Sequence, residues 1–193
     1  MHIGNNNINT LSPADNSSIG IFVRGCHFDI QPQNTFNNCY FGCILMNNGL
    51  DPSTIKNNDF NNNVIGVWAF GNNGFPFAGG VQITCNRFDN GAIAIAVQDY
   101  IVGGVLLTTG SLDNQGNCGP FNQNPADNVF NQTPGLPSIF TDIMAQQTGG
   151  TFTYFHRADI PGIAQFMPTI TGNVTNSQCV SPPDSPEENC GNR

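Results

Sequence analysis

The sequence predicts an all-β protein whose short strands stack as about four coils of a parallel β-helix, followed by an irregular capping segment. Three observations predict this class. The pattern Asn-x-(Phe/Ile)-(Asn/Asp) recurs every 24 to 28 residues, and a block of small and apolar residues follows it at a nearly constant offset. Asparagine supplies 29 of the 193 residues, whereas charged residues make up only 9%, against roughly 25% in an average globular protein.

Each repeat begins with an asparagine, and the first four lie 28, 24 and 28 residues apart. The second block starts eight residues after this asparagine in three repeats, and six residues later than that in the first, where a polar loop is inserted. Strands of three to five residues with Asn and Gly turns between them fit this period. Leucine-rich repeats have a similar period, but their leucine pattern is absent. The asparagines are Asn6, Asn34, Asn58 and Asn86, with a later match at Asn128.

Stacked coils place equivalent residues in columns about 4.8 Å apart. We therefore expect an inward column of apolar side chains and two ladders of side-chain amides, since like charges repel at this spacing and asparagine tolerates the backbone of a sharp bend. The inward column is Ile8, Phe36, Phe60 and Phe88. The first ladder is Asn6, Asn34, Asn58 and Asn86, and the second is Asn9, Asn37, Asn61 and Asp89.

The signature Asn-x-Phe-(Asn/Asp)-Asn followed by Gly-(Val/Ile) resembles that of right-handed parallel β-helix proteins of the pectate-lyase-like superfamily. The resemblance covers residues 1–109, which we assign to the coils. It implies a right-handed path, which the periodicity by itself does not. The signature indicates a fold and carries little information about function.

The order of motifs over residues 110–180 resembles the segment that closes the β-helix in large secreted surface proteins of Bacteroidota. In such proteins a sorting domain commonly follows. Because the chain has neither a signal peptide nor a sorting domain, we expect an internal or processed piece of an exported protein. The motifs are Gly116–Gly119, Asn124–Phe130, Phe152–His156 and Ile170–Thr175.

Within the capping segment, residues 138–147 are predicted to form one short helix, with Ser138 or Thr141 as its N-cap. Residues 151–156 alternate in the manner of a strand. A cap is expected because an open coil exposes an unpaired strand edge. Residues 181–193, with three prolines and an acidic cluster, are predicted to be an extended linker or tail.

Seven cysteines are present and none lies in a Cys-x-x-Cys pair, which disfavours a zinc or thioredoxin-like site. Few lysines and many Asn, Gly and Thr residues favour a secreted or cell-surface location, where disulfides persist. Either several cysteines are buried as small apolar residues or at least one disulfide forms. The residues most suited to a disulfide are Cys118, Cys179 and Cys190, which lie in loop-rich sequence.

Composition excludes two function classes. No run of 18 apolar residues is present, so we expect no membrane insertion. Five cations and a net charge of −8 cannot form the basic surface that binds nucleic acids.

If the chain were a polysaccharide lyase, Arg87 would act as the base, and Asp59 would hold a calcium ion beside it. We favour a surface ion pair for these residues, since no further carboxylate joins that column. A glycosidase needs two carboxylates about 5–9.5 Å apart, and only Asp89 and Asp99 are near enough in sequence. The histidines do not predict a metal cluster, because His2, His27 and His156 fall in different parts of the repeat or cap.

We accordingly predict no catalytic, cofactor-binding or metal-binding residue, with calcium the one ion to consider. The expected function is that of a non-catalytic extracellular module, acting as a structural, adhesive or filament-forming element. Its expected partners are further copies, neighbouring domains or glycans. The alternatives are a fragment of a carbohydrate-active enzyme, or a carbohydrate-binding module. A glycan would contact Trp68, expected to point outward, together with Phe75 and Phe77.

Overall fold

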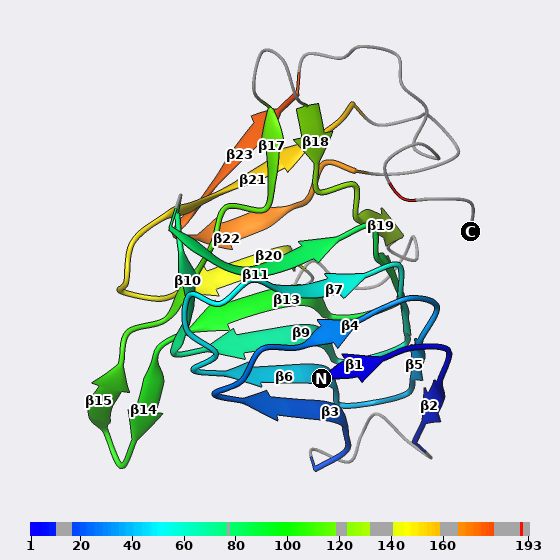
Figure 1. Ribbon diagram of the computed structural model, residues 1–193, viewed down its shortest axis with the longest axis horizontal. Helices are drawn as coiled ribbons and strands as arrows, with labels where there is room; N and C mark the ends of the chain where they lie inside the picture. The colour runs from blue at the N-terminus through cyan, green and yellow to red at the C-terminus, as the bar shows by residue number, and fades with distance from the viewer. Residues whose placement is uncertain are drawn as a thin grey trace.

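The computed structural model describes residues 1–10, 17–76, 78–118, 123–131, 141–158, 166–179 and 190. In this part of the chain the protein is all-β, as expected: strands make up the regular structure and most pair in parallel. Figure 1 shows the strands layered from the N-terminal end at the bottom to the C-terminal strands at the top.

Three sheets of five or six strands contain most of the structure, and in sheets B and C each repeat contributes one strand. Sheet A contains β1 (His2–Ile3), β4 (Asp29–Ile30), β7 (Ser53–Lys56), β11 (Gly79–Thr84), β10 (Asn72–Phe75) and β16 (Ser111–Leu112). Sheet B contains β2 (Asn7–Asn9), β5 (Thr35–Asn37), β8 (Asp59–Asn61), β12 (Arg87–Asp89) and β19 (Val129–Asn131). Sheet C contains β3 (Ile19–Arg24), β6 (Phe41–Met46), β9 (Ile65–Phe70), β13 (Ile93–Gln98), β20 (Thr141–Gln146) and β22 (Ile170–Gly172).

The sheets are not uniform. All pairs in sheets B and C are parallel, whereas β10 and β11 in sheet A are antiparallel. Three further pairs lie outside them: the antiparallel β14 (Tyr100–Val102) with β15 (Val105–Thr108), the antiparallel β17 (Gly116–Cys118) with β18 (Gln123–Pro125), and the parallel β21 (Phe152–His156) with β23 (Val174–Gln178).

The core follows from the register of sheet B. Ile8 lies opposite Phe36, and the column continues through Phe60 and Phe88 to Phe130. The ring centroids of Phe36 and Phe60 are 4.7 Å apart and those of Phe60 and Phe88 are 4.9 Å apart, with nearly parallel planes. Four of these five residues are almost fully buried, and Ile8 is half-buried. The aromatic column therefore fills the axis of the stack.

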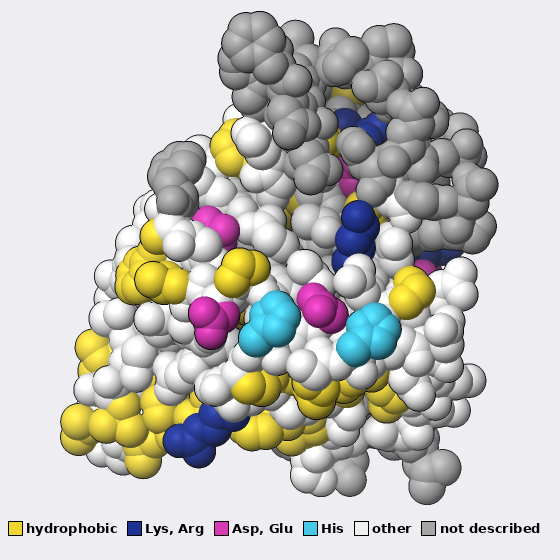
Figure 2. Space-filling model, viewed as in Figure 1, with side chains coloured by type: hydrophobic (Ala, Val, Ile, Leu, Met, Phe, Trp, Pro, Cys, Tyr) yellow, Lys and Arg dark blue, Asp and Glu magenta, His cyan; other side chains and the backbone are white. Residues whose placement is uncertain are grey.

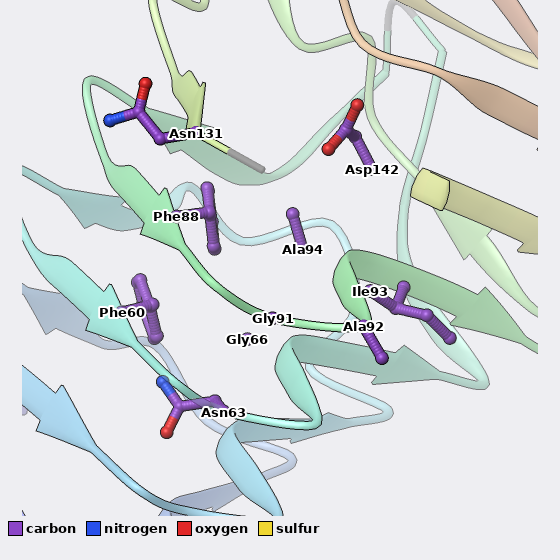
Figure 3. Close-up of a pocket in the computed structure, with 10 residues that line it drawn as sticks. All are labelled: Phe60, Asn63, Gly66, Phe88, Gly91, Ala92, Ile93, Ala94, Asn131 and Asp142. Carbon is purple, nitrogen blue, oxygen red and sulfur yellow. The ribbon is translucent and has the colours of Figure 1, made fainter. Parts of the chain in front are cut away.

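Small residues make room for this column. A Cβ atom at Gly66 would lie 2.7 Å from Cδ1 of Phe88 and 2.7 Å from the carbonyl oxygen of Ala94. One coil higher Ala94 occupies the equivalent position, and there the Phe88 and Phe130 centroids are 5.8 Å apart. We attribute the wider ring spacing to the methyl group of Ala94. Figure 3 shows Phe60 and Phe88 beside Gly66 and Ala94.

The chain turns at two recurrent bends with positive φ. The residue before each ladder asparagine has φ between 51° and 57° in all five repeats. In three repeats a second bend falls four residues after the ladder asparagine. Asparagine adopts this left-handed backbone more readily than most residues. The first bend is at Asn5, Gln33, Asn57, Cys85 and Asp127, and the second is at Asn38, Asn62 and Asn90.

The predicted helix is wrong for residues 141–146, which form β20; residues 138–140 lie outside the described part. Thr141 pairs in register with Ile93 and Ile143 with Ile95, so sheet C imposes a strand on this segment. Ile143 and Ala145 point into the core, which is the period-two pattern of a strand. The predicted strand at residues 151–156 is confirmed as β21.

Stacking does not stop at residue 109, because β19 extends sheet B, and β20 and β22 extend sheet C. The tail predicted over residues 181–193 lies outside the described residues except for Cys190, which is buried.

The β14–β15 hairpin projects from the body at the lower left of Figure 1. Figure 2 shows a concentration of hydrophobic side chains in the same place and along the lower edge. The five large aliphatic residues of the hairpin are 48–61% exposed. They are Ile101, Val102, Val105, Leu106 and Leu107.

The core and the hairpin offer a matched test. Leu45 is fully buried in sheet C, whereas Leu106 is 48% exposed on the hairpin. Leu45→Ala should lower the free energy of unfolding by about 2–5 kcal/mol because a cavity remains, and Leu106→Ala should change it by less than about 0.5 kcal/mol. Urea denaturation of both variants measures this. Equal losses would contradict the packing described here.

Candidate functional site: the amide ladder and the exposed apolar surfaces

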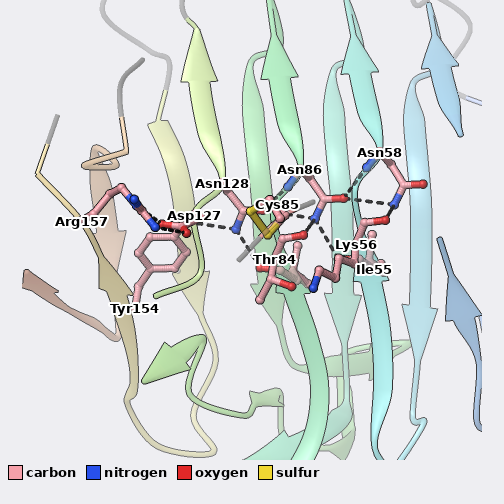
Figure 4. The surroundings of a disulfide bond; sticks show 12 residues. Ile55, Lys56, Asn58, Thr84, Cys85, Asn86, Asp127, Asn128, Tyr154 and Arg157 are labelled. Carbon is pink, nitrogen blue, oxygen red and sulfur yellow. Dashed lines mark hydrogen bonds and ion pairs between the residues drawn. A yellow bond between two sulfur atoms is a disulfide. The ribbon is translucent and has the colours of Figure 1, made fainter. Parts of the chain in front are cut away.

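The structure joins Asn6, Asn34, Asn58, Asn86 and Asn128 into one ladder of hydrogen bonds. The side-chain amide nitrogen of each asparagine donates to the side-chain oxygen of the next, over 2.8–3.1 Å, and its backbone N–H donates to the same oxygen. The four later members are almost completely buried. Figure 4 shows the chain of bonds from Asn58 through Asn86 toward Asn128.

The second amide hydrogen of each ladder residue is also used. Asn58 Nδ2 donates to the carbonyl oxygens of Ile30 and Lys56, and Asn86 Nδ2 donates to those of Ile55 and Thr84. Each buried amide of the ladder therefore bonds the coil before it and the coil after it. Because the hydrogen-bonding groups of these side chains are occupied within the protein, they hold the coils together and are not available to a ligand.

The ladder ends on a tyrosine. Asn128 Nδ2 donates to the hydroxyl oxygen of Tyr154 at 3.1 Å. Burial, which outweighs the hydrogen bond from Asn128, raises the pKa of Tyr154 above its ordinary value. The hydroxyl thus remains neutral and terminates the row without introducing a charge.

An ion pair lies next to this terminus. Arg157 donates from Nε and from Nη2 to the two carboxylate oxygens of Asp127, each at 2.6 Å. The Asp127 side chain is fully buried, and the guanidinium carbon of Arg157 lies 5.7 Å from the ring centroid of Phe166. No sequence pattern indicates this pair, since the two residues are 30 positions apart in different elements.

The second ladder is less regular than the alignment indicates. Asn61 Nδ2 donates to Asn37 Oδ1, and Asn131 Nδ2 donates to Asp89 Oδ1. At the N-terminal end, Asn37 donates to Asn7, whereas Asn9 accepts from Asn38. Its members are exposed or half-buried, so this ladder lies on the surface.

A third set of stacked amides was not predicted from the sequence. Asn48 Nδ2 donates to Asn73 Oδ1 at 2.9 Å, and the backbone N–H of Cys26 donates to Asn48 Oδ1. Both asparagines follow the apolar block of sheet C, and an alignment extended past that block would have revealed them.

The residues considered for catalysis do not gather at one place. Arg87 lies opposite Asp59 in register, and its Nε forms an ion pair with Asp89 at 2.7 Å. Asp99 lies elsewhere, at the base of the hairpin, where its carboxylate accepts hydrogen bonds from Gly110 and Thr148. Asp89 and Asp99 therefore lie in different elements and are held by different partners.

Two of the three histidines lie near each other. His2 pairs in register with Asp29, and His27 Nε2 is 3.8 Å from Asp29 Oδ2. His156 is buried in β21, where its Nδ1 hydrogen-bonds to the carbonyl oxygen of Arg157. Among the described residues, no group of three His, Cys, Asp or Glu side chains is placed to hold a metal ion.

A small hollow opens at the bend between sheets B and C, with room for about one water molecule. Figure 3 shows Asp142 and Asn131 at its rim and Phe60 and Phe88 on its wall. The carboxylate of Asp142 accepts hydrogen bonds from the backbone and hydroxyl of Thr169. The hollow is too small for a sugar residue.

Trp68 is half-buried on the outer face of sheet C, between the inward-pointing Val67 and Ala69. Its ring lies 4.7 Å from that of Phe41 and 5.1 Å from that of Phe70, and its Nε1 donates to Gln98. The neighbouring rings form a continuous row, and we call it the aromatic row. It consists of Tyr40, Phe41, Trp68, Phe70 and Tyr100. Phe75 is half-buried on β10, and Phe77 lies outside the described residues.

Two disulfides join distant segments: Cys118 to Cys179, and Cys85 to Cys190. All three cysteines expected to be bridged are in these bonds, and Cys85 is the partner that the sequence did not reveal. Disulfides of this kind are typical of oxidising compartments. Burial raises the pKa of the Cys43 thiol and, less strongly, that of Cys39, which disfavours the reactive thiolate form of both.

No known family model matches the chain, and searches of curated proteins and of solved structures found no match either. The described part of the chain contains no helix with the length and apolar character needed to span a membrane.

Replacing a buried ladder residue should be costly. Asn58→Ala removes the bonding partner of Asn34, Asn86 and two carbonyl oxygens, and leaving a buried polar group unpaired costs about 1–3 kcal/mol. We expect a loss of about 3 kcal/mol in the free energy of unfolding, measured by urea denaturation. The control Asn61→Ala, on the half-exposed ladder, should lose less than about 1 kcal/mol. Similar losses in both variants would refute the distinction.

The base of the hairpin should depend on pH. Burial disfavours the charge on Asp99, but hydrogen bonds from Thr148 and Gly110 outweigh it and lower the pKa of this carboxyl below its ordinary value of 3.8. The stabilisation is therefore complete above pH 3.8 and is lost as the pH falls through the pKa of the folded state. Asp99→Asn should reduce the hydrogen-exchange protection of the amides in β14 and β15 at about pH 7, and make little difference at about pH 2. An effect of equal size at both pH values would contradict this.

Proposed function

We propose that the chain is a non-catalytic structural module of a secreted or cell-surface protein, built as a right-handed parallel β-helix of about four coils with a C-terminal cap. The observation that supports this most directly is the amide ladder that runs from Asn6 to Tyr154 and is buried from Asn34 onward. It commits the recurrent polar side chain of every coil to holding the next coil. The two disulfides and the acidic composition fit an exported protein.

The charged groups near the cap support the same proposal. The carboxylates of Asp127 and Asp99 are both engaged in internal hydrogen bonds, to Arg157 and to Thr148 and Gly110 respectively. A general acid or base must be able to reach a substrate proton, whereas these groups are occupied in fixing the cap and the hairpin.

A carbohydrate-binding module is the second candidate, and the aromatic row favours it. Flat rings on an exposed sheet face can stack on the apolar faces of sugars, as aromatic side chains do in many binding sites. Trp68 is the largest ring of the row, although Phe41 and Phe70 already cover part of it.

The proposal is tested by incubating the chain with pectins, alginates and other uronates, with and without calcium, and measuring unsaturated and reducing ends. We expect no products, whereas a pectate lyase assayed in parallel should release them. Product formation that Arg87→Ala abolishes would replace the proposal with a lyase.

Affinity chromatography on the same polysaccharides, immobilised on a column, distinguishes a carbohydrate-binding module from a structural module. The structural module should pass through the column unretained. Retention that Trp68→Ala removes, while Phe22→Ala on the same face leaves it intact, would establish a carbohydrate-binding module in its place.

A further inference from the structure

Three asparagines of the chain, Asn48, Asn73 and Asn90, are followed directly by glycine. An asparagine in this setting can lose its side-chain amide without an enzyme. The backbone nitrogen of the next residue attacks the side-chain Cγ atom, and a glycine has no side chain to hinder the attack. The reaction requires that this nitrogen is not held by a hydrogen bond and that the carboxamide can turn toward it. The structure separates the three pairs on both counts.

The side chains of Asn48 and Asn73 are held in the third set of stacked amides. Asn48 is 4% exposed, and Asn73 is fully buried. Asn48 Nδ2 donates to Asn73 Oδ1 at 2.9 Å, and Asn73 Nδ2 donates to the carbonyl oxygens of Phe70 and Gly71. Turning either carboxamide toward the following nitrogen would break these buried bonds. Asn90, in contrast, is exposed at the second bend of the fourth coil.

The attacking nitrogens differ in the same way. Gly49 N–H donates to the carbonyl oxygen of Asn72 at 3.0 Å, and Gly74 N–H donates to Asn72 Oδ1 at 3.1 Å. The N–H of Gly91 makes no hydrogen bond with any residue that the structure describes. Gly91 also lines the small hollow drawn in Figure 3, which has room for about one water molecule. The nitrogen that follows Asn90 is therefore the one that is available.

The equivalent bends of two earlier coils do not offer this chemistry. Asn38 and Asn62 have φ of 56° and 55°, close to the 56° of Asn90, but the residues after them are Cys39 and Asn63. Cys39 N–H donates to Asn63 Oδ1 at 2.8 Å, and Asn63 carries a buried side chain of its own. Of these three bends, glycine follows the asparagine in the fourth coil alone.

We propose that Asn90 is a site of spontaneous deamidation, and that the fold protects the other two Asn-Gly pairs from the same reaction. The Gly91 nitrogen loses its proton to solvent and bonds to Cγ of Asn90. The bond between Cγ and the amide nitrogen breaks, and that nitrogen leaves as ammonia with a proton from solvent, so that a succinimide ring remains.

Water then opens the succinimide ring in one of two directions. Addition at Cγ breaks its bond to the Gly91 nitrogen and yields aspartate. Addition at the backbone carbonyl carbon breaks the original peptide bond and yields isoaspartate, in which the main chain runs through the side chain. No atom is oxidised or reduced, and water is the co-reactant. The inference does not depend on the proposed structural role.

Either product changes the bend that leads into β13. A new carboxylate appears directly after Asp89, whose own carboxylate already pairs with Arg87 and accepts a hydrogen bond from Asn131. Two like charges thus become neighbours. Isoaspartate also adds one carbon to the main chain, at a residue whose backbone N–H donates to the carbonyl oxygen of Asn131.

Peptide mass spectrometry of the purified chain, incubated at mildly alkaline pH, tests the proposal. The reference is the same chain unfolded in urea with its disulfides reduced, because all three Asn-Gly pairs then have the same local chemistry. We expect Asn48, Asn73 and Asn90 to convert at similar rates in the unfolded chain. In the folded chain, Asn90 should convert at least about tenfold faster than either of the others, since only its reaction leaves the buried hydrogen bonds intact.

The reaction route is tested in water enriched in heavy oxygen. The product should carry a heavy oxygen atom, and part of it should be isoaspartate, because a succinimide opens in both directions. Asn90→Gln should abolish conversion at this position, since the longer side chain closes a larger and less favourable ring. The matched control Asn62→Gln, at the equivalent bend, should leave the conversion of Asn90 unchanged. Circular dichroism and thermal unfolding establish that both variants fold.

Conversion of Asn48 or Asn73 as fast as that of Asn90 in the folded chain would overturn the inference. It would also be overturned if Asn90 stayed intact in the folded chain while the unfolded chain converted, or if the product contained aspartate without isoaspartate. None of these results involves uronate cleavage or glycan retention, so the proposed function is tested independently.

Discussion

The structure depends on a side-chain amide that must be bonded on both sides. Each buried asparagine of the first ladder accepts two N–H groups from one coil and donates to the other, and water cannot replace these bonds inside the stack. A coil therefore completes its neighbour's hydrogen bonding and receives its own from it. This mutual dependence keeps the repeat in register and leaves insertions to the loops, as in the first repeat.

A ladder of this kind has to end somewhere, and the two ends of the stack differ. At the C-terminal end, Asn128 reaches the Tyr154 hydroxyl, and the ion pair of Asp127 and Arg157 closes the same region. At the other end of the ladder, Asn6 is exposed.

Periodicity explains which features could be predicted. The columns of Phe36 and of Asn34 follow from residue spacing alone, since every coil repeats the same local environment. The strand at residues 141–146 has no such repeat, and there the edge of β13 overrides local helix propensity. Cys85 was missed because a disulfide depends on spatial proximity: it occupies the bend that Asn57 occupies one coil earlier, and no sequence signal links it to Cys190.

Exposed strand edges are usually protected by charges, prolines or covering loops, because an unprotected edge recruits other chains. The N-terminal edge of sheet C carries Arg24 as its single charged residue, and its outward positions are Ile19 and Phe22. The β14–β15 hairpin, with its exposed aliphatic residues, extends toward the same edge, and Asp99 fixes its base. An edge that were to stay in water would gain nothing from these residues and would risk aggregation.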